Sequence, residues 1–216
     1  MNEIDKKTIA LMCKNSYKFS TLKNQTTFEN SRGLQCVIYE DAANKQICTT
    51  FRGSDENIDW IYNLMFFSYD MGEGCRVHWG HYVMFFSDGL GPKIVDAIRV
   101  LKEKRRNYRV VVSGHSLGGC LAQICAYELY RAKQIKGHVL IFGSSTIGNR
   151  KFQRYLRDNT SGYVCCNIES DCVPKLISVA FPNFYCRQIL LPNIREQGCL
   201  SSHDIDYYLL LLSAIS

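Results

Sequence analysis

The sequence predicts an α/β protein with a mostly parallel central sheet and helices on both faces. In its second half, apolar runs with the length of buried strands alternate with runs of helical spacing, a pattern typical of a parallel sheet covered on both sides. The 216 residues contain no Gly/Ser or Pro linker, low-complexity tract or internal repeat, which indicates one domain over residues 1–216. The expected strands are "YRVVVSG", "HVLIFGS", "GYVCCNIESD" and "FYCRQILLP", and the expected helices are "SLGGCLAQICAYELYRAK", "NRKFQRYLRDN" and "SHDIDYYLLLLSAI".

The first half of the chain is expected to begin with a helix and a β-hairpin. Apolar residues recur at helical spacing from Ile4 to Tyr17. The β-rich runs "LQCVIYE" and "KQICTTF" are separated by "DAANK" and end at "RGS". Residues 55–77 have poor periodicity, and a long helix follows from about Gly80 to Lys104, with an interruption at "GLGP" because Pro92 disfavours helix in the preceding residue.

Composition excludes several classes of protein. A hydrophobic content of 46% with 21% charged residues is typical of a globular chain rather than a disordered one. The net charge of +6 is modest, and the densest basic run, "KEKRR", closes a helix, so no nucleic-acid partner is expected. The apolar tail "YYLLLLSAIS" is far shorter than the ~20 residues of a membrane span, so no transmembrane segment is expected.

The cysteines favour a reducing compartment. The chain has eleven, an odd number, and its start, "MNEIDKKTIALMCKN", lacks the apolar core of a signal peptide. The thiols are therefore expected to be mostly reduced and buried, and the protein to be cytoplasmic. No CxxC pair is accompanied by a second Cys pair or a His pair at metal-ligand spacing, so no metal is expected. No organic cofactor is expected either.

Ser116 is the candidate nucleophile. It lies in "GHSLG", a G-x-S-x-G pattern between an expected strand and an expected helix. Side chains at Gly114 and Gly118 would collide with the neighbouring strand or helix in so tight a turn, and the turn presents the hydroxyl above the sheet. The N-terminus of the following helix favours the negative charge that develops during nucleophilic attack.

A serine hydroxyl needs a general base, and His203 is the best candidate among five histidines. It lies in a polar segment before the last expected helix, where a loop can reach over the end of the sheet. The acid should follow a later strand and precede the histidine, an order that Asp171 in "NIESDCVPKL" satisfies, with Glu169 as the alternative. The carboxylate would orient the imidazole and stabilise its charged form.

With these residues assembled, the chain resembles the class 3 (fungal-type) lipases of the α/β-hydrolase fold. The resemblance rests on five ordered blocks plus His203, and covers roughly residues 47–176. The blocks are "FRGSDENIDWIYNL", "GCRVHWGHY", "GHSLGGCLAQICAYEL", "FGSSTIGNRKFQRY" and "ESDCVPKL".

The resemblance implies Ser116 as nucleophile, Asp171 as acid and His203 as base. It also implies that Ser54 and the backbone N–H of Leu117 form the oxyanion hole. Residues 55–77 correspond to the lid of the family, an apolar flap expected to cover the site in water and to turn outward on a lipid surface. Its expected substrate contacts are Trp60, Ile61, Leu64, Phe66 and Phe67.

The sequence therefore predicts a serine hydrolase that cleaves carboxylic esters of lipids, either triacylglycerol-like or phospholipid-like, through an acyl-enzyme. Its expected partners are the lipid ester itself and, peripherally, a membrane or lipid-droplet surface. A soluble carboxylesterase or thioesterase is the alternative within the enzymes, and the apolar stretch 58–67 favours the lipase. A catalytically silent lipid-binding module is the alternative outside them, although such a module has no need of the complete set of candidate residues.

Overall fold

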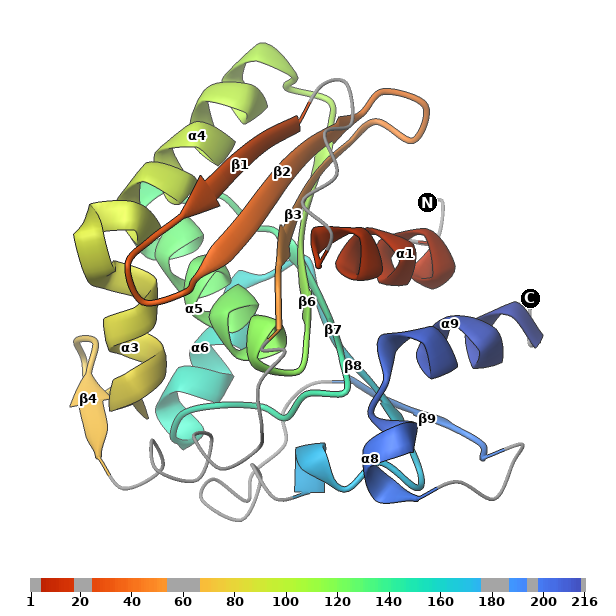
Figure 1. Cartoon of the computed structure of the whole chain (residues 1–216). Coiled ribbons are helices and arrows are strands. Elements are labelled where there is room, and N and C mark those ends of the chain that lie inside the picture. The colour runs from red at the N-terminus through yellow and green to blue at the C-terminus, as the bar shows by residue number, and fades with distance from the viewer. Residues whose placement is uncertain (1–4, 18–24, 54–66, 176–186, 194–197, 215–216) are drawn as a thin grey trace.

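A seven-stranded sheet forms the centre of the protein (Figure 1). The computed structural model describes residues 5–17, 25–53, 67–175, 187–193 and 198–214. The sheet order is β1-β2-β3-β6-β7-β8-β9; β1–β2 and β2–β3 are antiparallel, and the four remaining pairs are parallel. The strands are β1 (Gln25–Glu29), β2 (Gln35–Asp41), β3 (Gln46–Phe51), β6 (Arg109–His115), β7 (His138–Phe142), β8 (Gly162–Ile168) and β9 (Arg187–Leu191).

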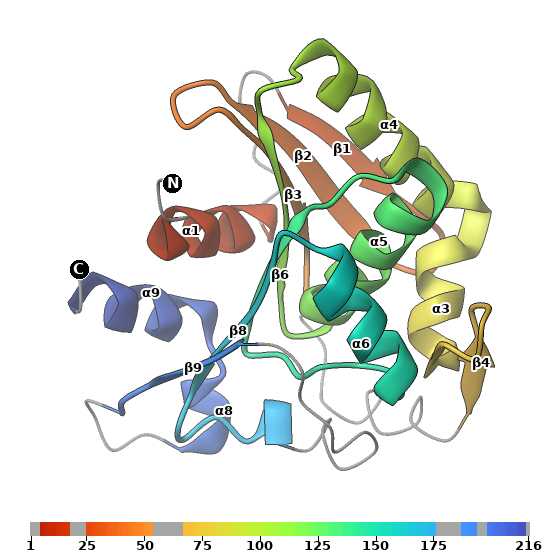
Figure 2. The same ribbon diagram turned by 180° about the vertical axis from the view of Figure 1, so that it is seen from behind.

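Helices cover both faces of this sheet, as Figures 1 and 2 show from opposite sides. One face carries α3 (Trp79–Phe86), α4 (Leu90–Lys104), α5 (Leu117–Lys133) and α6 (Arg150–Asn159). The other carries α1 (Lys6–Ser16) and α9 (Ile205–Ala214), and the short α8 (Cys199–Ser202) precedes α9. The predicted mostly parallel sheet with helices on both faces is confirmed.

Each face has its own apolar core because the parallel strands bury side chains on both sides. Ile94 and Leu121 belong to the core beneath α4 and α5. Ile9 and Tyr208 belong to the core beneath α1 and α9, where an ion pair of 2.5 Å between Lys14 and Asp206 also joins these two helices. The two termini of the described chain thus pack together on one side of the sheet.

The expected long helix from Gly80 to Lys104 is two helices. It breaks at a short 3₁₀ turn, η1 (Ser87–Gly89), in which Asp88 and Gly89 have positive φ values of 57° and 65°. The break begins two residues before the expected "GLGP" position and overlaps it at Gly89. Pro92 falls in the first turn of α4, where a proline is tolerated because the first amides of a helix have no partner within it.

The range 55–77 divides into two parts. Its second part contains a two-stranded antiparallel hairpin, β4 (Ser68–Asp70) and β5 (Arg76–His78). Its first part, with Trp60, Ile61, Leu64 and Phe66, lies outside the described residues, so the expected lid contacts there stay predictions. Phe67 is described, and 74% of its side chain is exposed.

Candidate active site

Ser116 occupies a strained turn between β6 and α5. Its backbone angles, φ 56° and ψ −125°, are rare for a residue with a side chain, and such strain is frequent at functional sites. The turn is tight because β6 and α5 lie very close: a Cβ atom at Gly114 would lie 2.2 Å from the Gly118 carbonyl carbon. Ser116 thus precedes the first turn of a 17-residue helix, whose dipole favours negative charge nearby.

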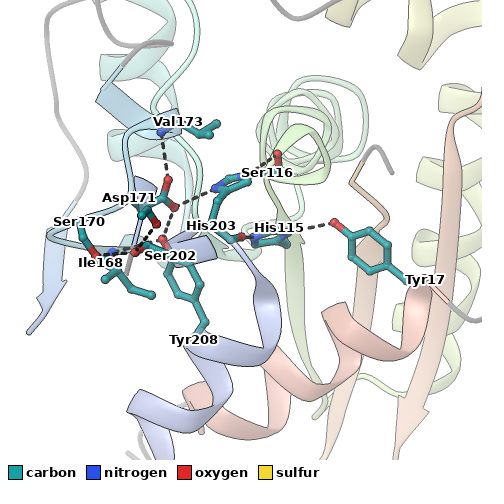
Figure 3. A network of polar contacts seen from close by, with 11 residues as sticks. Tyr17, His115, Ser116, Ile168, Ser170, Asp171, Val173, Ser202, His203 and Tyr208 are labelled. Carbon is teal, nitrogen blue, oxygen red and sulfur yellow. Dashed lines mark hydrogen bonds and ion pairs between the residues drawn. The ribbon is translucent and has the colours of Figure 1, made fainter. Parts of the chain in front are cut away.

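The turn between α8 and α9 brings His203 to this serine. In Figure 3 its imidazole lies between Ser116 and Asp171. The distance from Nε2 to the Ser116 Oγ is 2.8 Å, and the distance from Nδ1 to the Asp171 Oδ2 is also 2.8 Å. A carboxylate cannot donate, so Nδ1 carries the proton and Nε2 is free to accept the serine proton.

Asp171 follows the end of β8 and is 1% exposed. Its Oδ1 accepts a hydrogen bond of 3.0 Å from the backbone N–H of Val173, and its Oδ2 accepts a second bond, of 2.7 Å, from the Tyr208 hydroxyl. Together with the Nδ1–H of His203, this carboxylate therefore has three hydrogen-bond donors. A buried carboxylate can keep its charge only when it is hydrogen-bonded in this way. The structure brings Asp171, rather than the alternative Glu169, to the histidine.

Sequence reasoning did not identify Tyr208. This tyrosine is fully buried on α9, where its hydroxyl also accepts the backbone N–H of Ile168 at 3.2 Å. Burial, followed by the nearby charge of Asp171, raises the pKa of its phenol, so the hydroxyl stays protonated and donates. A tyrosine within the apolar run "YYLLLL" is a usable signal, because a buried phenol requires a hydrogen-bond partner.

His115 lies on the other side of His203, and their ring centroids are 4.8 Å apart (Figure 3). Its Nε2 is 2.8 Å from the backbone carbonyl oxygen of His203, and its Nδ1 is 2.9 Å from the Tyr17 hydroxyl. Burial, followed by the charge of His203, lowers the pKa of His115 to about 3. His115 thus connects the backbone of His203 to the Tyr17 hydroxyl.

Of the two residues expected to form the oxyanion hole, the structure describes Leu117 but not Ser54. Leu117 is the first residue of α5 and directly follows Ser116. Ser54 lies outside the described residues, although Gly53 before it is described. Phe51 packs against Gly118, so the chain leading to Ser54 leaves β3 beside the serine turn.

The described residues also bear on metal binding and on membrane crossing. Among the described residues, no group of three or more His, Cys, Asp or Glu side chains is arranged to hold a metal ion. None of the helices within the described ranges combines the length and apolar character needed to cross a membrane.

The strained serine turn at the carboxyl edge of a mostly parallel sheet defines the class of this protein as an α/β-hydrolase fold. Within that class, the family model for class 3 lipases matches residues 48–181, more than half of the chain. The chain belongs to the class 3 lipase family.

Curated relatives come from fungi. The chain is 28% identical over 171 residues to "Secreted mono- and diacylglycerol lipase 1" of Fusarium solani, a match that covers 78% of this chain and 50% of the relative. It is 32% identical over 146 residues to a lipase of Rhizomucor miehei, which covers 63% of this chain and 39% of the relative. The chain thus spans half or less of the length of these two relatives.

Solved structures share the fold. The native complex of Rhizomucor miehei lipase with its propeptide has a TM-score of 0.75 at 19% identity, over 97% of this chain and 78% of that one. A triacylglycerol lipase whose catalytic centre is described as a serine protease triad has a TM-score of 0.74 at 23% identity, over 89% and 81% of the two chains.

The expected cytoplasmic location is wrong. Relatives from Fusarium solani and Penicillium cyclopium are named as secreted lipases, which contradicts this expectation. The cysteine argument also fails in part, because Cys172 is disulfide-bonded. Eight further cysteines among the described residues are buried, and close packing inside a protein protects thiols whatever the redox state outside. A high cysteine count therefore does not report the compartment.

Proposed function

We propose that this protein hydrolyses carboxylic esters of lipids, with Ser116 as nucleophile, His203 as general base and Asp171 as the acid that orients it. The observation that carries the proposal is the continuous hydrogen-bonded line from the Ser116 Oγ through both ring nitrogens of His203 to the Asp171 Oδ2. Transfer of the serine proton to the Nε2 of His203, whose charged form Asp171 stabilises, makes the hydroxyl a competent nucleophile.

The reaction proceeds in two halves. The Ser116 Oγ attacks the ester carbonyl while its proton passes to the His203 Nε2, and the charged imidazolium is stabilised by Asp171. Collapse of the tetrahedral intermediate breaks the bond to the alcohol, which leaves with the proton from His203, and an acyl-enzyme forms. Water then gives its proton to His203 and attacks the acyl carbonyl; the carboxylic acid leaves and Ser116 regains its proton.

The developing oxyanion is held by backbone N–H donors. We assign these to Leu117, at the start of α5, and to Ser54, whose hydroxyl can add a further donor. Because a preorganised donor aimed at the oxyanion does not have to reorganise during the reaction, losing one raises the barrier by about 3 kcal/mol.

Glycerolipids are the proposed substrates. Two relatives are named as mono- and diacylglycerol lipases, and a membrane or lipid droplet is the proposed surface on which the substrate is met. We also propose one domain for residues 1–216, with a lid-like segment at about 55–77. The exposed Phe67 and Trp79 lie in and just beyond that segment and offer aromatic contact to a lipid surface.

A fluorophosphonate probe tests the nucleophile directly. The wild-type protein should be labelled on Ser116, and Ser116→Ala should lose both labelling and ester hydrolysis, with kcat falling by about 10⁶-fold. Ser213→Ala is the matched control, because that exposed hydroxyl bonds to the Leu209 carbonyl on the outside of α9. Hydrolysis by Ser116→Ala at the wild-type rate would refute the mechanism.

Substrate presentation tests the lipid and the lid. Hydrolysis of emulsified diacylglycerol, micellar phospholipid and a water-soluble ester should favour the emulsion. Measured across the solubility limit of one ester, the rate should rise sharply once an interface forms. A smooth saturation curve through that limit would contradict the lid.

A further inference from the structure

Tyr17 is the last link of a chain of polar contacts that begins at His203. It follows α1 and lies outside the residues 48–181 that the family model matches. In Figure 3 its hydroxyl points at His115, whose Nδ1 is 2.9 Å away. The two contacting residues are 98 positions apart in the sequence. The N-terminal helix thus reaches the serine turn directly.

The acceptors determine the direction of each hydrogen bond. The His203 carbonyl can only accept, so the Nε2 of His115, at 2.8 Å, carries the proton of the ring. A neutral imidazole has one N–H, and the low pKa of His115 keeps this ring neutral. Its Nδ1 therefore accepts from the Tyr17 hydroxyl, and the tautomer of His115 is defined by its two neighbours.

The same hydroxyl contacts the chain that leads to the oxyanion hole. The Tyr17 oxygen lies directly against Gly53, the last described residue before Ser54. A Cβ atom at Gly53 would lie 2.2 Å from that oxygen and 2.8 Å from the His115 carbonyl oxygen, so glycine is required for this approach. The Arg52 guanidinium lies over the Tyr17 ring, 5.5 Å from its centroid.

We propose that Tyr17 is a positioning residue of the active site, whose hydroxyl packs against Gly53, next to Ser54, and holds the backbone of His203 through His115. The inference rests on the proposed function. It deepens that function by adding the residue that follows the N-terminal helix to the machinery. Distant parts of the chain are linked here: the Tyr17 hydroxyl contacts His115 at the end of β6 and lies against Gly53 after β3, and His115 contacts the His203 carbonyl before α9.

Tyr17→Phe tests the hydroxyl while it keeps the ring. The Nδ1 of His115 loses its donor and the His203 backbone is held less firmly, so kcat should fall about 10- to 100-fold while KM stays within about twofold. The second-order rate of fluorophosphonate labelling should fall in parallel. Tyr127→Phe is the matched control: it removes a hydroxyl from another largely buried tyrosine, which donates at 3.4 Å to the Met71 carbonyl, and should leave both rates unchanged.

Measuring Tyr17→Phe in a His115→Ala protein tests whether the hydroxyl acts through His115 or only through the stability of the site as a whole. In a His115→Ala protein the path from Tyr17 to His203 is already broken. Tyr17→Phe should then reduce kcat several-fold less than it does in the wild-type background. An equal fold-loss in both backgrounds would contradict action through His115.

Nitrogen NMR of the histidine rings gives a readout that needs no turnover. In the wild-type protein the His115 ring should carry its proton on Nε2, and Tyr17→Phe should produce a mixture of tautomers and shift the resonances of His203. A wild-type His115 protonated on Nδ1 would overturn the proposal even if Tyr17→Phe did not fold.

The failure of this proposal differs from the failure of the proposed function. If the wild type is labelled on Ser116 and Tyr17→Phe is labelled equally fast, the positioning role is wrong and the hydrolase stands. If the wild type is not labelled, the hydrolase is wrong. Unchanged His203 resonances in Tyr17→Phe would then overturn the positioning role as well.

Discussion

Ser116 shows how one residue stores strain at a functional site. Its φ of 56° costs on the order of 1–3 kcal/mol for a residue with a side chain. The surrounding packing offsets this cost, because residues 110–129, which include the turn and most of β6 and α5, are all buried. Close backbone approach explains why glycines flank the serine, since Cβ atoms at Gly114 and Gly118 would clash with neighbouring backbone. These glycines were the strongest local signal in the sequence.

Tyr208→Phe tests the hydroxyl that shares the Asp171 Oδ2 with His203. Losing a hydrogen bond to a charged acceptor costs about 1.5–3 kcal/mol, so kcat/KM should fall about 10-fold. The hydroxyl holds in place the carboxylate that orients the imidazole, and without it that orientation is less well defined. The fall should be seen in steady-state hydrolysis and in the rate of fluorophosphonate labelling.

Tyr207→Phe is the control on the same helix. Its hydroxyl donates to Asn193 at 2.6 Å and not to the acid. The kcat/KM of this variant should match that of the wild type. A wild-type kcat/KM in Tyr208→Phe as well would remove the argument for its role.

At the scale of elements, the serine turn depends on how closely β3, β6 and α5 approach one another. Gly118→Ala would place a methyl group 2.1 Å from the Phe51 carbonyl oxygen, where neither backbone can yield cheaply. The free energy of unfolding should fall by at least about 1–3 kcal/mol, measured by urea denaturation. Gly198→Ala, which meets nothing within 4 Å and has a φ of −64°, should change the stability by no more than a few tenths of a kcal/mol.

The elements also show which predictions local pattern supports. The expected strands and helices of the second half are present, because buried strands and amphipathic helices have distinct periods. The edge strand β1 was not predicted, since it is short and mostly exposed and lacks a clear alternation. The helix break at Ser87–Gly89 was placed too late because Pro92 is compatible with a first helical turn.

At the scale of the whole molecule, two buried histidines couple stability to pH. Burial lowers the pKa of His81 and of His115 to about 3, against 6.5 for an exposed histidine. Between these values the unfolded chain binds protons that the folded protein does not. The free energy of unfolding therefore rises with pH from about 3 to 6.5, and their full contribution is present only above 6.5.

Urea denaturation at several pH values measures this linkage. Each histidine contributes a slope of up to about 1.4 kcal/mol per pH unit between pH 4 and 6. His81→Gln and His115→Gln should each reduce the slope by about one proton, and the double variant by about two. A slope that is the same in all four proteins would show that these histidines are not buried in neutral form.

Local sequence pattern was sufficient to predict the fold class and the order of the candidate nucleophile, acid and histidine. Both follow from local pattern: period, glycine spacing and position relative to strand ends. Which polar side chains contact the hydrogen-bonded series Ser116–His203–Asp171 is seen only in the folded protein. The supporting contacts join residues far apart in the sequence: Tyr208 and Asp171 are 37 positions apart, and Tyr17 and His115 are 98 positions apart. No local period encodes such contacts, because they arise only when separate helices pack on the same face of the sheet.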